Sequence, residues 1–347
     1  MEMVKVVFLL LIGLLLLIKG GDWFVDGATG LARRFKLPEI LIGATVVSIG
    51  TTLPEVMVSA QGAIGGNGAM AYGNAIGSII CNTSLIAAIT IAIKPSKADR
   101  KSLILPVAFF FGAAAFYAIV SYTLGYFYRW VGIVLLCTFV VYMVLTVLRM
   151  KKNPPEESNE DEEEQQPLEK LPLGKEIWAQ VRGKRTSILR EILMLVVGAA
   201  VIALGANLLV DNATAIAKAL NVPDTVIALT IVALGTSLPE LVTAVTSLIK
   251  GHGSLSLGNI IGANLFNLVL VSGVSVTISP FEVPVAAKLF GQNASLVLEI
   301  PLMFAVMALM CLPTLIRGKL SRVQGILLLA LYAAFCVVQF VLVQPVA

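Results

Sequence analysis

Gly50-Thr51-Thr52-Leu53-Pro54-Glu55 returns 185 residues later as Gly235-Thr236-Ser237-Leu238-Pro239-Glu240. Each copy places a carboxylate and a helix-breaking proline in the middle of an apolar run that is long enough to span a membrane. A carboxylate at that depth is costly, so a bound cation is the natural reason for keeping it. Two copies predict one site that is built from two halves of the chain.

The composition is that of a polytopic membrane protein. Of the 347 residues, 58% are hydrophobic and only 13% are charged, whereas about a quarter of the residues of a soluble domain are charged. The net charge of +4 does not indicate nucleic acid, and the four cysteines lie in apolar runs without metal-type spacing. The first apolar run, 4–18, lacks the basic start and the cleavage site of a signal peptide, so we expect a mature helix. We expect the only histidine, His252, to be an ordinary loop residue.

We expect an all-α polytopic membrane protein whose ten transmembrane helices form two inverted five-helix repeats. Residues 1–149 would be the first inverted repeat, 150–187 a cytoplasmic acidic linker and 188–347 the second inverted repeat. The stretches 22–36 and 207–221 are expected to extend the first and sixth helices along the membrane surface. The apolar runs place the ten helices at 3–19, 39–65, 72–93, 102–122, 128–149, 188–210, 224–249, 255–279, 293–315 and 323–344.

The distribution of Lys and Arg predicts the orientation, because cytoplasmic loops carry an excess of these residues. With both termini outside, 21 of the 25 basic residues fall on the cytoplasmic side, and only Lys5, Arg129, Lys218 and Lys288 lie outside. The linker is then cytoplasmic. Its acidic run, 156–164, lacks apolar periodicity, which favours a solvated linker over a calcium sensor.

The repeat extends beyond the two hexapeptides at the same offset and without a gap. An odd number of helices in each half requires the halves to be inverted relative to each other, which places a shared site near the membrane midplane. Helix packing alone, with Gly for close contact and Pro for kinks, is the alternative, but it does not account for two Glu in register. The further matches are Val25-Asp26 with Val210-Asp211, Ala28-Thr29 with Ala213-Thr214, Pro38 with Pro223, Thr45 with Thr230, Gly73-Asn74 with Gly258-Asn259, Gly77 with Gly262 and Asn82 with Asn267.

The repeated segments offer oxygen ligands. Pro54 lacks an N–H and its ring clashes with the carbonyl four residues back, so we expect the second helix to break near 48–53 and to free carbonyls there. Pro54 and Pro239 would then each begin a second half-helix that carries the Glu. We expect Gly73 and Gly77 to permit close helix approach. Carboxylate, hydroxyl, amide and carbonyl oxygens favour hard cations, Ca²⁺ more than Mg²⁺, and also suit Na⁺. The side chains chosen on this ground are those of Glu55, Glu240, Thr51, Thr52, Thr236, Ser237, Ser78, Asn82 and Asn267.

Both repeats resemble the α-repeats of the Ca²⁺/cation antiporter superfamily, and most resemble those of the prokaryotic Na⁺/Ca²⁺ exchangers. The resemblance covers nearly the whole chain. It implies that Ca²⁺ binds to the carboxylates of Glu55 and Glu240 and to the carbonyls of Thr51 and Thr236. It also implies alternating access, in which helices 1 and 6 slide across the other eight. The Na⁺ sites of the family correspond here to Ser48, Ser78, Ser237 and Ala233, beside the same Glu residues.

The chain departs from the family pattern at a few positions. Ala263 stands where the family often has Ser, which removes a hydroxyl expected to help bind Na⁺. Asn267 stands where some relatives have Asp, which argues against K⁺ co-transport. Thr52 replaces Ser conservatively, and the short linker leaves no room for the calcium-sensing domains of animal relatives.

The leading interpretation is therefore a secondary antiporter that exchanges Ca²⁺ for Na⁺, and the alternative is Ca²⁺/H⁺ exchange, since two midplane carboxylates also carry protons. A channel is disfavoured, because channels usually build a filter around an oligomeric axis. We do not expect an enzyme, because the only His is in a loop. We expect no cofactor, no nucleic acid and no obligate protein partner, only Ca²⁺, Na⁺ and the lipid bilayer. The expected location is the inner (plasma) membrane of a prokaryote.

Overall fold

The fold is a bundle of long apolar helices. A computed structural model describes residues 2–35, 37–95, 98–152, 187–219, 235, 237–285, 287–342 and 344–345. Within these ranges, eight helices are long and apolar enough to cross a membrane, and two further apolar helices, Leu238–Ile249 and Arg322–Val337, are shorter. The predicted helical polytopic membrane class is confirmed, although short strands among the described residues make the fold mostly helical rather than all-α. Apart from residues at its two ends, the acidic linker lies outside the described residues.

The first half of the chain contains five helical segments. Two of them continue through π-helical turns, so that 39–64 and 68–93 each run as one helix. The elements are α1 (Glu2–Arg34), α2 (Glu39–Ile42), η1 (Gly43–Val47), α3 (Ser48–Ile64), α4 (Gly68–Cys81), η2 (Asn82–Ala87), α5 (Ala88–Ile93), α6 (Arg100–Thr123), β1 (Tyr126–Phe127) and α7 (Arg129–Lys152).

The second half repeats several of these boundaries at the offset of 185. α3 and α13 end at Ile64 and Ile249, and the π-helical segments η2 and η4 begin at Asn82 and Asn267. The predicted helix at 224–249 is described only at residue 235 and from residue 237 onward. The elements are α10 (Ile188–Ala219), α13 (Leu238–Ile249), α14 (Gly253–Phe266), η4 (Asn267–Val271), α15 (Ser272–Ile278), β2 (Phe281–Glu282), β3 (Ala287–Leu289), β4 (Gln292–Asn293), η5 (Ser295–Glu299), α16 (Ile300–Arg317), α17 (Arg322–Val337), η6 (Val338–Leu342) and β5 (Gln344–Pro345).

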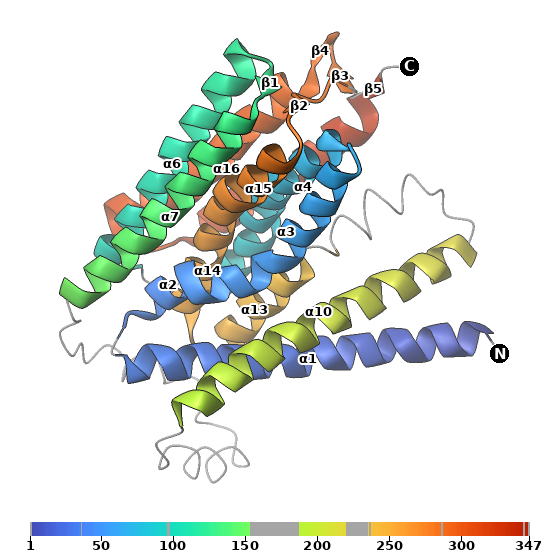
Figure 1. The fold of residues 1–347 in the computed structure, drawn as a ribbon. Coiled ribbons are helices and arrows are strands. Elements are labelled where there is room, and N and C mark those ends of the chain that lie inside the picture. Colours follow the sequence, from blue (N-terminus) through green and yellow to red (C-terminus); the bar gives the residue numbers. More distant parts are fainter. Residues whose placement is uncertain are drawn as a thin grey trace.

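Helices α1 and α10 lie side by side and cross the other helices at a steep angle (Figure 1). A Cβ atom on Gly13 would lie 2.9 Å from the carbonyl oxygen of Gly205, and one on Gly27 would lie 2.7 Å from that of Glu191. Glycines at these positions let the two backbones touch, as small residues do between membrane helices. Within the described residues, the predicted extensions at 22–36 and 207–221 continue these two helices without interruption.

The turns gather at two ends of the bundle. At the upper end in Figure 1, β1 pairs with β2, and β3 pairs with both β4 and β5. At the opposite end, the amide of Ala98 donates to the carbonyl of Gly318 over 3.0 Å. His252 lies in the predicted turn, directly before α14, and its Nδ1 is 2.7 Å from the Glu39 carboxylate. This contact ties the start of α14 to the start of α2.

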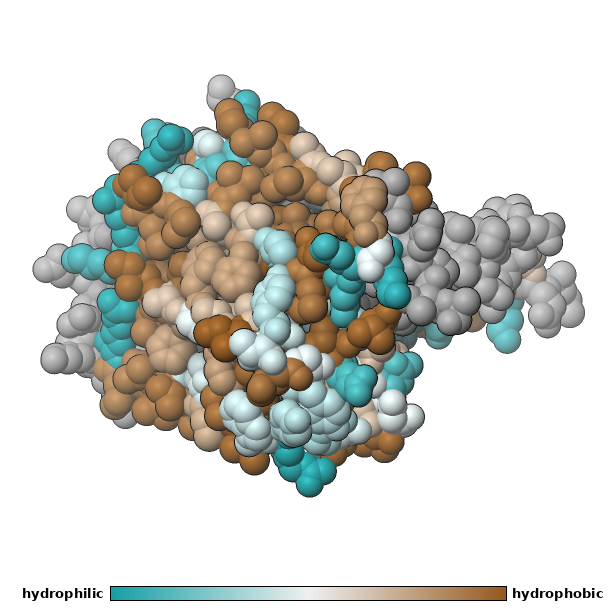
Figure 2. Space-filling view, turned by 90° about the horizontal axis from the view of Figure 1, so that it is seen from above, coloured by the Kyte–Doolittle hydropathy of each residue, from teal (hydrophilic) through white to brown (hydrophobic). Residues whose placement is uncertain are grey.

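The outer surface is largely apolar. Large hydrophobic side chains on α1, α7 and α10 are exposed, among them Leu15, Leu148 and Leu189, at 61%, 55% and 70%. Seen from the end that carries the strands, brown hydrophobic residues occupy much of the surface (Figure 2). An exposed apolar belt of this kind is expected of helices that face lipid.

Candidate cation site

Two buried carboxyl groups from different halves of the chain meet inside the bundle. Glu55 lies on α3 and Glu240 in the first turn of α13, and both side chains are 0% exposed. The helices that carry them, α3 and α13, are in contact, and the two carboxyl groups lie near enough for their charges to affect each other. Within the described residues, no Lys, Arg or His forms an ion pair with either of them. Two buried acids without a basic partner need a cation or protons.

Most of the polar atoms that lack a partner belong to the same region. In the described part of the chain, none of the four carboxylate oxygens of Glu55 and Glu240 accepts a hydrogen bond. The helices that carry them, α3 and α13, pack against α14 and against the π-helical segments η2 and η4. Leaving a buried polar atom unpaired costs about 1–3 kcal/mol, so a cluster of them indicates a ligand site. The other buried side chains here in which every polar atom lacks a partner are those of Thr52, Asn82, Ser237, Thr243, Ser247, Ser256 and Asn267. Asn259 and Asn264 each keep one unpaired atom, Nδ2 and Oδ1, respectively.

The second helix does not break as predicted. Pro54 lies inside α3, which runs unbroken from Ser48 to Ile64, and the distortion is a π-helical turn at 43–47 instead. The prediction of a break at 48–53 is therefore wrong. One missing N–H is tolerated in a helix that is enclosed by other helices. Thr51 and Glu55, four residues apart, share one face of the intact helix.

The second motif behaves as predicted at its proline. Pro239 occupies the first turn of α13, and Ser237 precedes the helix without donating or accepting a capping hydrogen bond through its side chain. The positive end of the helix dipole therefore points toward the Glu240 region. Thr236 and Ala233, the other expected ligands of this half, lie outside the described residues.

The remaining expected ligands of the first half are buried beside the motif. Ser48 is 0% exposed, and its hydroxyl lies 2.7 Å from the Gly43 carbonyl and 2.9 Å from the Asn259 carbonyl. Ser78 on α4 is 4% exposed. It lies one turn before Asn82, where η2 begins, so the two side chains share a helical face as predicted.

A π-helical turn starts at the same position in both halves. Asn82 opens η2 and Asn267 opens η4, and both amide side chains are fully buried without a described partner. π-helical turns of this kind occur often at functional sites. The structure therefore places an amide from each half in the core, at the point where the helix widens.

Gly258 and Gly262 of α14 allow close helix approach beside the first motif. A Cβ on Gly262 would lie 2.6 Å from the Cα of Ala44, and one on Gly258 would lie 2.9 Å from the carbonyl carbon of Ile40. At these glycines, α14 packs closely against α2 and η1. Gly73 and Gly77, for which close approach was predicted, have no such neighbour among the described residues. Their partners by the repeat would fall within 225–229, outside the described ranges.

Two asparagines of the repeat, Asn74 and Asn259, were not predicted as site residues. The Asn74 amide donates to the Glu55 carbonyl over 3.2 Å, and the Thr51 hydroxyl donates to Oδ1 of Asn259 over 3.2 Å. The sequence feature that could have indicated them is the Gly-Asn pair, which recurs in register at 73–74 and 258–259. Both asparagines contact the first motif directly.

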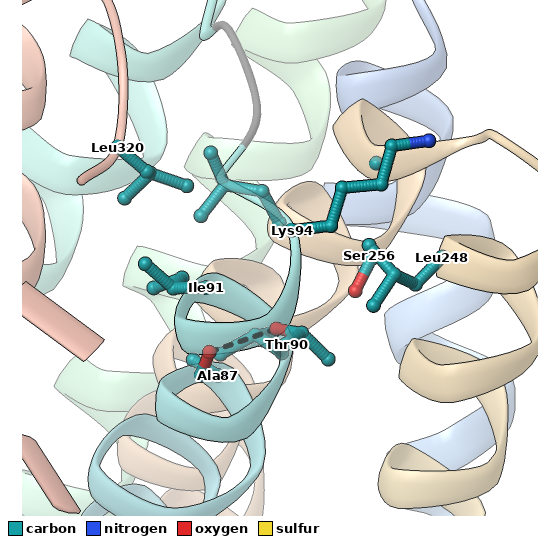
Figure 3. Close-up of a pocket in the computed structure, with 10 residues that line it drawn as sticks. Ala87, Thr90, Ile91, Lys94, Leu248, Ser256 and Leu320 are labelled. Carbon is teal, nitrogen blue, oxygen red and sulfur yellow. Dashed lines mark hydrogen bonds between the residues drawn. The ribbon is translucent and has the colours of Figure 1, made fainter. Parts of the chain in front are cut away.

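Among the described residues, neither the pocket between α5 and α14 nor an acidic cluster offers a second cation site. The pocket lies between the end of α5 and the start of α14, and Lys94 is the charged residue of its lining (Figure 3). It contains none of the predicted ligands, and the Thr90 hydroxyl in it is satisfied by the Ala87 carbonyl at 2.8 Å. Among the described residues, no three His, Cys, Asp or Glu side chains are grouped to hold a metal. The two Glu with neutral oxygens remain the candidate.

Comparison with known proteins identifies chains that are similar over nearly the whole length. The family model described as "Sodium/calcium exchanger protein" matches residues 5–148 and 190–341. The sodium/calcium exchanger MaX1 of Methanosarcina acetivorans is 31% identical, over 97% of this chain and 99% of that protein. The putative antiporter CaxA of Alkalimonas amylolytica is 35% identical, over 94% and 95%.

A solved structure agrees with this comparison. The sodium-calcium exchanger NCX_Mj, soaked with Na⁺ and Sr²⁺, superimposes with a TM-score of 0.75 at 31% sequence identity. The match covers 96% of this chain and 98% of that one. Both repeats of the sequence thus fall within the compared region.

Proposed function

Since this chain belongs to the sodium/calcium exchanger family, we propose that it exchanges Ca²⁺ for Na⁺ across the membrane at a midplane site shared by Glu55 and Glu240. The observation that carries the proposal is the meeting of two fully buried carboxyl groups without a described basic partner. Two carboxylates balance the charge of one Ca²⁺. An empty site would leave two buried charges, so each transport step has to be made with the carboxylates neutralised.

The proposed ligands are oxygens on both motifs. For Ca²⁺ they are the carboxylates of Glu55 and Glu240 and the carbonyls of Thr51 and Thr236. For Na⁺ they are the same carboxylates with oxygens of Ser48, Ser78, Ser237 and Ala233. Thr52, Asn82 and Asn267 supply further buried oxygens, which their lack of hydrogen-bond partners supports. Such mixed, flexible oxygen sets suit Ca²⁺ and Na⁺ better than Mg²⁺.

We further propose that 1–149 and 188–347 form two inverted halves joined by a linker at 150–187. The pairing of β1 with β2 supports this arrangement. β1 follows the fourth helix of the first half, whereas β2 follows the third helix of the second half. Each helix carries the chain to the other face of the membrane, so two halves of the same orientation would place β1 and β2 on opposite faces. Because the two strands pair, the halves must have opposite orientations in this proposal. The contact of Ala98 with Gly318 gives the same argument at the other end.

The proposed orientation places the strand-bearing end outside and the opposite end in the cytoplasm. Described basic residues near the turns of the opposite end include Lys94, Arg100, Lys250, Lys319 and Arg322, while the strand-bearing end has Arg129 and Lys288. This asymmetry supports the positive-inside assignment. The inner membrane of a prokaryote is the proposed location, and the prokaryotic relatives support it.

Alternating access is proposed to occur by sliding of α1 and α10 across the remaining helices. The glycine-mediated contact between these two helices supports movement as one unit. Phe24 of α1 is fully buried against Gly50, where the first motif begins, so a shift of α1 would uncover that motif.

Ca²⁺/H⁺ exchange is the second candidate. Ala263 is fully buried on α14 and supplies no hydroxyl at a position where the family often has Ser. A weaker Na⁺ site would leave protons as the alternative occupants of the two carboxylates.

The deciding experiment is ⁴⁵Ca²⁺ uptake into liposomes that contain the purified full-length protein. An outward Na⁺ gradient at equal pH on both sides should drive uptake, and a pH gradient without Na⁺ should not. The membrane potential is clamped with K⁺ and valinomycin in both cases. Uptake that ignores Na⁺ and follows the pH gradient would overturn Na⁺ coupling, and no coupled uptake would overturn the antiporter.

A further inference from the structure

Asn74 holds the backbone of the first motif from α4. Its Nδ2 donates to the carbonyl oxygen of Glu55 over 3.2 Å and to Oγ of Ser59 over 2.8 Å. Ser59 lies one turn after Glu55 on α3, so one amide spans the turn that carries the carboxylate. This contact stays within the first half of the chain.

Asn259 holds the same motif from the other half. The Thr51 hydroxyl donates to its Oδ1 over 3.2 Å, and the Ser48 hydroxyl lies 2.9 Å from its backbone carbonyl. All three residues are at most 2% exposed. Thr51 and Asn259 are 208 residues apart in the sequence. Their contact therefore fixes α14 of the second half against the turn of α3 that precedes Glu55.

The two asparagines are equivalent by the repeat but use different atoms. Asn74 donates through Nδ2, whereas Asn259 accepts through Oδ1 and its Nδ2 has no described partner. The sequence explains part of this difference, because the position equivalent to Ser59 is Ala244, which has no hydroxyl. The second half thus lacks the partner that orients Asn74, and Asn259 is available to the first half.

We propose that Asn259 and Asn74 are positioning residues that hold the two sides of the first cation-binding turn, Asn259 at Thr51 and Asn74 at Glu55. Neither needs to touch the ion. Asn259 turns the Thr51 hydroxyl proton away from the cation, while Asn74 fixes the carbonyl and hence the helical turn of Glu55. The proposal rests on the proposed function, since it concerns the geometry of that same site.

The inference has a thermodynamic signature. If Thr51 and Asn259 act through their mutual hydrogen bond, removing either partner should weaken Ca²⁺ binding by about fivefold, the equivalent of one neutral hydrogen bond. Removing both should cost little more than removing one, because residues in direct contact are not additive. A residue that only fills space would lower the stability without this coupling.

The experiment is a double-mutant cycle on Ca²⁺ affinity. Equilibrium ⁴⁵Ca²⁺ binding is measured on purified full-length Thr51→Val, Asn259→Ala and the double variant, with Tm recorded for each. A second cycle pairs Asn74→Ala with Ser59→Ala. The cross pair, Asn74→Ala with Thr51→Val, is the matched control and should be additive. Thr51→Ser keeps the hydroxyl, so it should bind Ca²⁺ more tightly than Thr51→Val.

Each outcome decides the matter. Coupled affinities within the pairs and additive affinities across them support the positioning roles. Additive effects within the pairs, or unchanged affinity, overturn them. If Asn259→Ala does not fold, the comparison of Thr51→Val with Thr51→Ser decides, because equal affinities would show that the hydroxyl is not used. If the unmodified protein binds no Ca²⁺, the proposed function is contradicted instead. This result is obtained before any variant is compared, so the two failures are distinguishable.

Discussion

At the scale of single residues, the chain is defined by two acids that membrane helices would ordinarily exclude. Glu55 and Glu240 are fully buried, and within the described residues neither has a hydrogen-bond donor. A carboxylate in this setting requires a cation or a proton, and the surrounding hydroxyl and amide groups are neutral. The charge of the site therefore resides in these two side chains.

Glu55→Gln and Glu240→Gln should each abolish Ca²⁺ transport while leaving the fold intact. Glutamine keeps the size of the side chain and removes its charge, so the bound Ca²⁺ would lose a carboxylate ligand and half of its charge balance. ⁴⁵Ca²⁺ flux in liposomes measures the loss, and Tm checks the fold. Flux equal to that of the unmodified protein in either variant would contradict a site with two carboxylates.

Ala263→Ser should raise the apparent affinity for Na⁺ and change the affinity for Ca²⁺ much less. The substitution adds a hydroxyl at a buried position of α14. A single neutral ligand of hydrogen-bond strength is worth about 1 kcal/mol, so a several-fold shift is expected. Na⁺ titration of Ca²⁺ efflux at fixed pH measures it. An unchanged Na⁺ dependence would show that residue 263 does not face a Na⁺ site.

At the scale of elements, the helices divide into a crossing pair and a bundle. α1 and α10 touch through glycines, and the carboxylate of Glu191 accepts two hydrogen bonds from Arg34 at one end of this pair. Lys250 at the end of α13 reaches back to Asp26 of α1 at 2.7 Å. Glycines thus bring the backbones of α1 and α10 into contact, Arg34 and Glu191 join the pair at one end, and Lys250 links α1 to α13.

Gly205→Val should destabilise the protein, because its Cβ would lie 2.8 Å from the Gly13 carbonyl oxygen and the helices would have to separate. Overpacking of this kind costs about 1–3 kcal/mol. The matched control is Gly112→Ala on α6, where no described atom lies within 4 Å and where helix propensity favours Ala. Thermal unfolding in detergent compares the two. A stable Gly205→Val variant would contradict the close approach of α1 and α10.

At the scale of the whole molecule, the ends of the bundle differ in charge and in structure. Short strands close one end, where β3 pairs with β5 beside the C-terminus. The other end carries most of the described basic residues near turns. The charge difference is the physical basis of the proposed orientation, since basic loops are retained in the cytoplasm.

In a background without the four native cysteines, Lys319→Cys should be labelled by a membrane-impermeant maleimide only from the cytoplasmic side. Gln292→Cys should be labelled only from outside. Both residues are exposed at opposite ends of the bundle, Gln292 in β4 and Lys319 between α16 and α17. Labelling of intact cells before and after permeabilisation measures the sidedness. The reverse pattern would overturn the orientation and leave the cation site unaffected.

The sequence by itself determined the membrane class and the two-fold repetition, and it predicted a site at Glu55 and Glu240. Each of these depends on patterns along the chain, namely the length of apolar runs, a constant offset and the cost of a charge at depth. The start of α13 at Pro239 also followed from local chemistry, because proline suits the first turn of a helix.

Only the tertiary structure decided how the two halves meet. It kept α3 intact through Pro54, because neighbouring helices compensate for one lost hydrogen bond. It joined Thr51 to Asn259 and brought Gly262 against Ala44. Such contacts depend on distances between segments that are far apart in the chain, and a pattern of residue types does not contain those distances.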